Sequence, residues 1–257
     1  MTEKTLYQEL RPEELIERVN TCPIAYLPLG TLEWHSFHLP FGVDMLVPLE
    51  IFKRIAARVG GVVLPPLFLG PDKEETRDGK TYYGMDVLAF EEGHPQQLTG
   101  SAYHVSKELY IQILENIVKH LKRNGFAALI GHGHGPSSNV LMECRERFAE
   151  EYGMVITNLY EIGYEIQTDH AAVNETSLMM ELYGGLVDLS RIPEGSPPVA
   201  VWGADPRAAA SKAEGARCAA RNGEMAERFL MELRERLPKP DLRLDFRHIK
   251  DLTKGDA

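Results

Sequence analysis

Apolar runs bounded by glycine or proline alternate along this chain with longer segments whose apolar residues recur at helical spacing. Four runs are short enough to be buried strands, at 24–29, 62–69, 126–130 and 154–159. Helices are predicted over 46–59, 103–123, 139–152 and, with interruptions at Gly215 and Gly223, over 207–237. This alternation is typical of an α/β protein with a parallel sheet and crossover helices.

Residues 70–100 break the pattern, because they have no sustained period and are dense in Gly, Asp, Glu and Pro. A loop of this length is uncommon in a compact domain unless it has a function. We therefore expect a functional excursion from the core at this point.

The size and composition are those of one globular domain. The chain has 257 residues, of which 44% are hydrophobic and 26% charged, so we expect a single domain over 1–257 and exclude fibrous and disordered classes. Lys and Arg number 28 against 38 Asp and Glu, a formal charge of -10. This is the wrong sign for contact with phosphate backbones, and we expect no nucleic-acid partner.

The cysteines and the N-terminal stretch indicate the compartment. Cys22, Cys144 and Cys218 are far apart and odd in number, which supports neither a disulfide framework nor a CxxC site. The first residues lack the basic start and apolar core of a signal peptide, and no later stretch approaches ~18 continuous apolar residues. We expect a soluble, cytoplasmic protein with no membrane partner.

The loop after the first predicted strand holds four potential metal ligands within twelve positions, at the strand end where open α/β sheets bind ligands. Glu33 and His35 are two residues apart, which on an extended segment turns both side chains to one side, and Asp44 can return there after the Leu39-Pro40 turn. Imidazole and carboxylate together suit Zn, Mn or Fe. Taken alone, the pattern fits solvated loop acids and a satisfied polar histidine better.

Two further clusters follow. After the third strand, His132 and His134 alternate with glycines, and histidines held among glycines at a strand end have little packing value, which favours a metal site. Residues 169–177 precede an apolar run; there Asn174 or Thr176 would make a reasonable helix N-cap, and acids near a helix start are common. Spacing alone does not make His170 catalytic.

Three blocks together resemble the creatininase (creatinine amidohydrolase) family, in the same order and at similar separations: LPLGTLEWHSFHLPFGVD, GHGHG and DHAAVNETSLMMELYGGLVDLSR. The likeness covers most of the chain. It implies a three-layer α/β/α sandwich with a mostly parallel central sheet, usually oligomeric and often hexameric, with one or two divalent metal ions at the strand ends. We therefore expect a homo-oligomer with a small-molecule substrate.

The resemblance also implies ligands. Glu33, His35 and Asp44 match the ligands of the first block, and Asp44 matches a position that can bridge two metals. His134 is the best match for the motif histidine, and His132 remains a second candidate because the alignment is uncertain by one residue. Glu175 matches an acid that is a ligand or lies beside one.

His170 matches the histidine that handles protons in the family. Because imidazole gains and loses a proton near neutral pH, it would protonate the leaving group, with Asp169 or a neighbouring carbonyl fixing its tautomer.

The chain also departs from the family pattern. Creatininase has a glutamate ligand where this chain has Pro136, so the second metal needs another acid, with Glu175 the first choice, or the site is mononuclear. A family tryptophan is replaced by Ile166, which weighs against creatinine as the substrate. The excursion offers its own side chains for a different pocket, namely Tyr82, Tyr83, His94 and Gln96.

These observations predict a metal-dependent hydrolase in which metal-activated water attacks the carbonyl of a small cyclic or linear amide. Two alternatives stay open. One is hydrolysis of a C–C or lactone bond in a polyhydroxylated, inositol-derived ring ketone, which the polar excursion favours. The other is a non-catalytic metal-binding protein, which Pro136 favours.

Overall fold

The computed structural model describes residues 4–89 and 94–244. Four parallel strands form the central sheet in the order β2-β1-β5-β6. Their bounds are β1 (Ile24–Leu29), β2 (Val62–Val63), β5 (Ala128–Gly133) and β6 (Val155–Asn158). The predicted α/β class with a mostly parallel sheet is confirmed.

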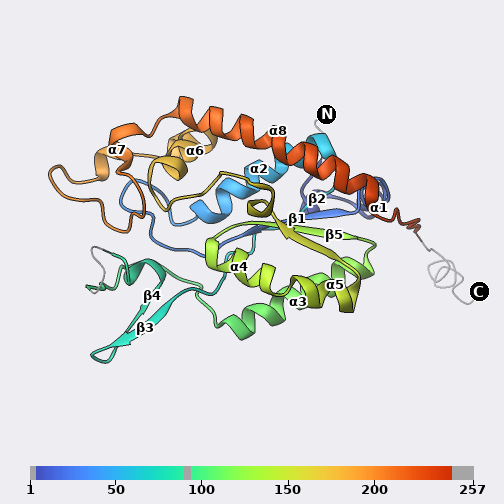
Figure 1. Ribbon diagram of the computed structural model, residues 1–257, viewed down its shortest axis with the longest axis horizontal. Helices are drawn as coiled ribbons and strands as arrows, with labels where there is room; N and C mark the ends of the chain where they lie inside the picture. Colours follow the sequence, from blue (N-terminus) through green and yellow to red (C-terminus); the bar gives the residue numbers. More distant parts are fainter. Residues whose placement is uncertain (1–3, 90–93, 245–257) are drawn as a thin grey trace, which may run out of the picture.

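Helices cover both faces of this sheet (Figure 1). One layer holds α2 (Val43–Val59), α6 (Val173–Tyr183) and α8 (Lys212–Arg236), and the other holds α3 (Lys107–Arg123), α4 (Gly135–Glu143) and α5 (Arg145–Tyr152). The remaining helices are α1 (Pro12–Thr21), α7 (Pro206–Ala209) and the short 3-10 turns η1 (Tyr7–Glu9), η2 (Gly84–Asp86), η3 (Tyr160–Ile162), η4 (Gly184–Leu186) and η5 (Leu189–Arg191).

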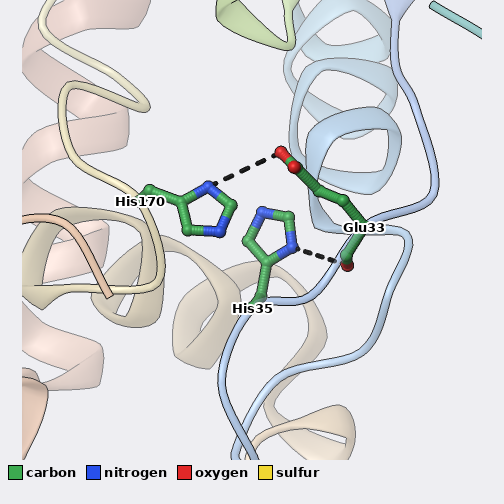
Figure 2. A group of neighbouring side chains, drawn as sticks. All are labelled: Glu33, His35 and His170. Atoms are coloured by element: carbon green, nitrogen blue, oxygen red, sulfur yellow. Dashed lines mark hydrogen bonds and ion pairs between the residues drawn. The ribbon is translucent and has the colours of Figure 1, made fainter. Parts of the chain in front are cut away.

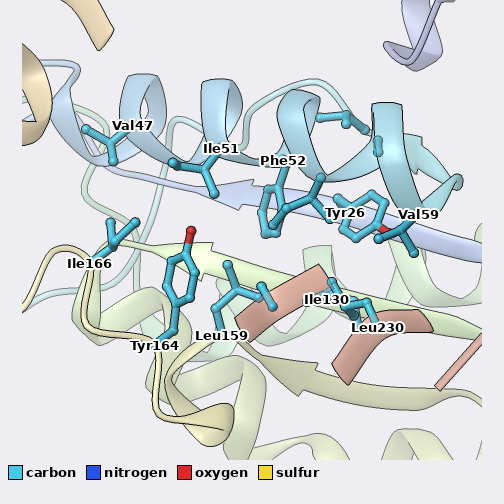
Figure 3. Close-up of a cluster of buried hydrophobic side chains, with 14 of the residues drawn as sticks. Tyr26, Val47, Ile51, Phe52, Val59, Ile130, Leu159, Tyr164, Ile166 and Leu230 are labelled. Atoms are coloured by element: carbon cyan, nitrogen blue, oxygen red, sulfur yellow. The ribbon is translucent and has the colours of Figure 1, made fainter. Parts of the chain in front are cut away.

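The core lies in two layers because successive β1 side chains point to opposite faces. Tyr26 packs against Phe52 of α2 with ring centroids 5.3 Å apart, in a cluster that includes Ile130 and Leu230 (Figure 3). Leu27, the next residue in β1, belongs to the cluster under α3 and α5. Burial on both faces leaves the strand ends as the place for polar side chains.

Two strands differ from their predicted bounds. The second strand pairs only at Val62–Val63, because Pro65 and Pro66 lack the N–H that a ladder needs. The segment still follows β1, since Leu67 N–H donates to Pro28 O at 3.0 Å. The third strand runs on into the histidine motif and ends at Gly133 rather than at residue 130.

The helix bounds also differ. The segment 139–152 is two helices that meet at Cys144. α3 begins at Lys107 rather than at residue 103, because the Ser106 hydroxyl caps it by accepting from Leu109 N–H. α8 begins after Ser211 and is continuous through both glycines that were expected to interrupt it. Gly215 instead permits close packing on α6, because a Cβ there would lie 1.9 Å from Ser177 O.

The excursion is an antiparallel hairpin of β3 (Glu74–Arg77) and β4 (Lys80–Tyr83), turning at Asp78-Gly79, and it projects from the domain (Figure 1). A bridge between Gly70 and His104 joins its two ends, and a bridge between Leu32 and Ala102 fixes them beside the loop after β1.

Among the helices of residues 4–89 and 94–244, none is both long and apolar enough to cross a membrane.

Candidate metal centre

Buried acids and histidines from four parts of the chain converge at the carboxyl ends of the central strands. The loop after β1 supplies two side chains, and the other three come from the first turn of α2, the turn between β5 and α4, and the first turn of α6. In that order they are Glu33, His35, Asp44, His134 and Glu175. These are the five residues that the sequence singled out as ligands.

Two of the candidate ligand groups at this site share one carboxylate. Glu33, Asp44 and His134 form one group, and His35, Asp44 and Glu175 form the other, each with its ligand atoms within 4.8 Å of one another. His35 Nε2 lies 3.7 Å from Asp44 Oδ1 and 3.6 Å from Glu175 Oε2, and His134 Nε2 lies 3.5 Å from Glu33 Oε1. Asp44 is therefore placed to bridge two adjacent cations.

His35 and His134 each form a hydrogen bond through Nδ1, and this bond turns Nε2 of the same ring toward the cluster. His35 Nδ1 lies 3.1 Å from Glu33 O, so the neutral ring, the form that binds a metal, donates there and has its lone pair on Nε2. His134 Nδ1 lies 2.9 Å from Ser137 Oγ, whose own hydroxyl donates to Gly30 O at 3.0 Å. Fixing the tautomer through the outer nitrogen is how metal-binding histidines are held in proteins.

His170 lies beside this pair of groups and belongs to a third, because one of its ring nitrogens lies within 4.8 Å of ligand atoms of Glu33 and His35. Its Nε2 donates to Trp34 O at 2.6 Å, and its Nδ1 lies 3.7 Å from Glu33 Oε1, while its ring lies alongside that of His35 (Figure 2). Burial, followed by the charge of His35, lowers the pKa of His170 to about 3. The imidazole is neutral in this structure, whereas the sequence led us to expect titration near neutral pH.

Asp169 does not hold His170. Its carboxylate accepts from Asn174 N–H at 2.7 Å and from Glu175 N–H at 3.0 Å. It therefore caps the start of α6, and the expected caps Asn174 and Thr176 lie inside the helix. Of the two means suggested for fixing the His170 tautomer, the neighbouring carbonyl, Trp34 O, makes the contact.

The electrostatics of the cluster call for a cation. Burial and the neighbouring carboxylates raise the pKa of Glu33 well above its usual range, and burial raises the pKa of Glu175 to about 7. Burial alone would lower the pKa of His35, but Asp44 and Glu175 outweigh it and raise that pKa to about 9.

Within the described chain, Glu33 Oε2, His35 Nε2 and Asp44 Oδ2 are buried without hydrogen-bond partners. Orphaned oxygen and nitrogen atoms of this kind fit one or two divalent metal ions.

Strained backbone surrounds the site. Ser36, Gln167 and Ala171 have φ values of 59°, 54° and 53°, in the left-handed region that non-glycine residues rarely adopt. Gln167 Nε2 and Ala171 N–H both donate to the Glu175 carboxylate, at 3.3 and 2.8 Å. Such strain is concentrated at functional sites, and here it holds an acid of the cluster in place.

His132, the second candidate for the motif histidine, lies outside the cluster. It is fully buried between the rings of Tyr160 and Tyr164, with centroids 4.6 and 5.2 Å away. Burial lowers its pKa to about 3. His132 is thus a neutral core residue, and His134 is the histidine that meets the acids.

The cluster opens into a cavity of about 320 Å³. From the excursion, Asp72, Met85 and Leu88 line it, and not the expected Tyr82, Tyr83, His94 and Gln96. Tyr83 instead stacks on His104, with the ring planes 9° apart. A second, mostly apolar cleft of about 650 Å³ lies between α3 and the β2 edge, and of the described residues that line it none is an acid.

Sequence reasoning missed Asp72. Its Oδ2 lies 3.1 Å from His134 Nε2, and it lines the same cavity. A signal was available: Asp72 closely follows the second predicted strand, and in a parallel sheet that strand end meets the same edge as the other two. The absence of a regular period after residue 70 obscured it.

A parallel sheet whose strand ends carry two carboxylate-histidine groups defines an α/β protein with a candidate divalent metal centre. A family profile described as "Creatininase: Creatinine amidohydrolase" matches residues 8–228, and the chain belongs to this family. It is 29% identical over 238 residues to the creatinine amidohydrolase of Pseudomonas putida, covering 80% of this chain and 84% of that protein.

Solved structures agree with this assignment. A mutant creatininase complexed with creatine is 25% identical, with a TM-score of 0.63 over 89% of this chain and 98% of the other. A mutant creatininase of Zn-Zn type is also 25% identical, with a TM-score of 0.64 over 90% and 99% of the two chains.

Proposed function

We propose that this chain is a metal-dependent hydrolase that cleaves a C–N bond of a small cyclic or linear amide. The observation that carries the proposal is the pair of ligand groups that share Asp44 beside a cavity of small-molecule size. Metal pairs bridged in this way are used by hydrolases to act on both the attacking and the leaving atoms. Family membership and the activity named for the Pseudomonas putida relative support the same class of reaction.

The residues divide into two ligand sets. Glu33, Asp44 and His134 would hold one ion, and His35, Asp44 and Glu175 would hold the other; Zn, Mn and Fe all accept such ligands. Bound ions of this kind lower the pKa of water from 15.7 to about 7 and polarise a carbonyl.

His170 would move the proton. Its Nε2–H is engaged by Trp34 O, so Nδ1 carries the lone pair and faces the acids. A neutral imidazole in this position can accept the proton of the attacking water at Nδ1. The same atom can then deliver that proton to the leaving nitrogen.

The side chains on the cavity wall indicate which kind of amide the site would accept. Ile166, at the position matched to a family tryptophan, is fully buried in the core (Figure 3) and is not among the residues that line the cavity. The indole of Trp202 is 64% exposed and lies on the cavity wall with Met85 and Leu88. A small amide with a planar or apolar portion fits this wall.

The test is a panel of creatinine, lactams, cyclic ureides and formamides, assayed beside a lactone and a cyclic diketone. We expect hydrolysis of at least one amide, loss of that activity with a chelator, and its return with added Mn or Zn. Opening of the lactone or the diketone with no amide turnover would contradict the proposal, as would activity that is indifferent to chelation.

A further inference from the structure

The group at His134 lacks an acid that the family motif supplies. Pro136, in the first turn of α4, stands where the resemblance places a glutamate ligand, and its side chain cannot bind a metal. Glu175, our first choice as the replacement, lies with His35 and Asp44. A further acid lies next to His134.

Asp72 is the acid that contacts His134. It lies between β2 and β3, and its side chain is 12% exposed. A Cβ built on Gly84 would come 2.6 Å from Asp72 Oδ2 and 3.0 Å from Glu33 Oε2, so both carboxylates face the same small space. Only glycine leaves that space open, and Gly84 adopts a φ of 53° as well.

The hydrogen bonds of His134 restrict what can lie between it and Asp72. Ser137 donates its proton to Gly30 O, so His134 Nδ1 must donate to Ser137 and Nε2 of a neutral ring has only a lone pair. That lone pair meets a carboxylate oxygen 3.1 Å away. Two acceptors at this distance need either a proton or a cation between them. Two atoms each ~2.1 Å from one ion lie roughly 3.0–3.4 Å apart at ordinary bond angles.

We propose that Asp72 is a further ligand of the ion that Glu33, Asp44 and His134 would hold. The inference rests on the proposed metal site. Asp72 is outside the set of atoms mutually within 4.8 Å, so an ion shared with Glu33 and Asp44 would require a small shift of its carboxylate. Asp72 Oδ1 accepts from Lys73 N–H at 2.6 Å, which leaves Oδ2, the atom that faces His134, as the ligand atom. The excursion then contributes directly to the metal centre.

The first experiment measures metal equivalents and affinity for the wild type, Asp72→Asn and the control Glu74→Gln, which makes the same charge change on the exposed strand β3. We expect the wild type and the control to bind two Mn ions, and Asp72→Asn to retain one with a Kd raised more than 100-fold for the other. Two ions bound with wild-type affinity by Asp72→Asn would overturn the inference while leaving the proposed function intact. No ion in the wild type would overturn both.

A spectrum separates a ligand from a residue that only orients His134. Asp72→Cys loaded with Co(II) should show a thiolate-to-cobalt charge-transfer band above the wild-type background, because a thiolate at this position coordinates directly. Glu74→Cys should show none. Absence of the band in an Asp72→Cys protein that binds two cobalt ions would overturn the inference.

Discussion

The imidazole rings of His35 and His170 lie alongside each other, with centroids 4.1 Å apart and planes tilted by 31°. Consecutive backbone carbonyls hold them in opposite tautomers: Glu33 O accepts from Nδ1 of His35, and Trp34 O accepts from Nε2 of His170. One ring therefore presents Nε2 to the acids and the other presents Nδ1. Under the proposed function, the first would be a ligand and the second a proton carrier.

This difference predicts that the two histidines have separable effects. His170→Ala should keep the wild-type metal content but lose turnover by roughly 10²–10⁴-fold, the usual contribution of a general acid or base. His35→Ala should lose the ion that Asp44 and Glu175 share with it. Metal analysis and kcat on the same preparations check both, and normal turnover by His170→Ala would show that the proton role is wrong.

Because Asp44 is shared, its replacement should reduce metal binding more than the replacement of Glu33 or of Glu175. Asp44→Asn should weaken both ions, whereas Glu33→Gln and Glu175→Gln should each weaken mainly one, because Asp44 is the residue that the group of His134 and the group of Glu175 share. Titration with Mn, followed by equivalents bound, distinguishes these patterns. Loss of a single ion in Asp44→Asn would mean that this carboxylate does not bridge.

Ser137 and Ser138 offer a matched pair for testing how His134 is held. Both are fully buried, but only the Ser137 hydroxyl contacts the His134 ring. Ser138 contacts His134 through backbone atoms alone, and its Oγ is without a hydrogen-bond partner in the described chain. Ser137→Ala should lower metal affinity at the His134 group by roughly 10–100-fold, as expected when the outer partner of a ligand is removed. Ser138→Ala should leave affinity unchanged, and equal affinities for the two variants would refute the orienting role.

The lowered pKa of buried His132 predicts that the free energy of unfolding depends on pH. Its folded-state pKa of about 3 is below the unfolded value near 6.5, so below pH 6.5 the unfolded chain binds a proton that the folded chain does not. Its contribution to stability is complete above pH 6.5 and is lost as pH falls toward 3, by up to about 1.4 kcal/mol per unit. In chelator-treated protein, the free energy of unfolding of His132→Leu should fall less between pH 7 and 5 than that of the wild type. Parallel curves would contradict this.

Much of the fold and site follows from the sequence because strand ends and ligand types leave local signals. Glu33, His35 and Asp44 are close in sequence, and His134 directly follows a strand, so their convergence needs only a parallel sheet. Asp72 reaches the site through an irregular segment whose ends are joined to each other and to the loop after β1 by isolated bridges. Local sequence patterns do not encode such tertiary contacts.

The helix and capping errors have a similar origin. Gly215 reads as a helix breaker in isolation, yet close packing against Ser177 of α6 makes it a requirement of the α8 interface. Asp169 caps α6 from outside the helix through two backbone N–H groups, a role that competes with the catalytic one its position beside His170 suggested. In both cases tertiary structure outweighs local propensity.

The most direct test of the account is the number of metal ions per chain in wild-type protein that has been stripped with a chelator, reloaded with Mn or Zn and freed of excess metal. Two carboxylate-histidine groups joined by Asp44 predict two equivalents. A single equivalent would contradict the binuclear site, and none would remove the basis for a metal-dependent hydrolase.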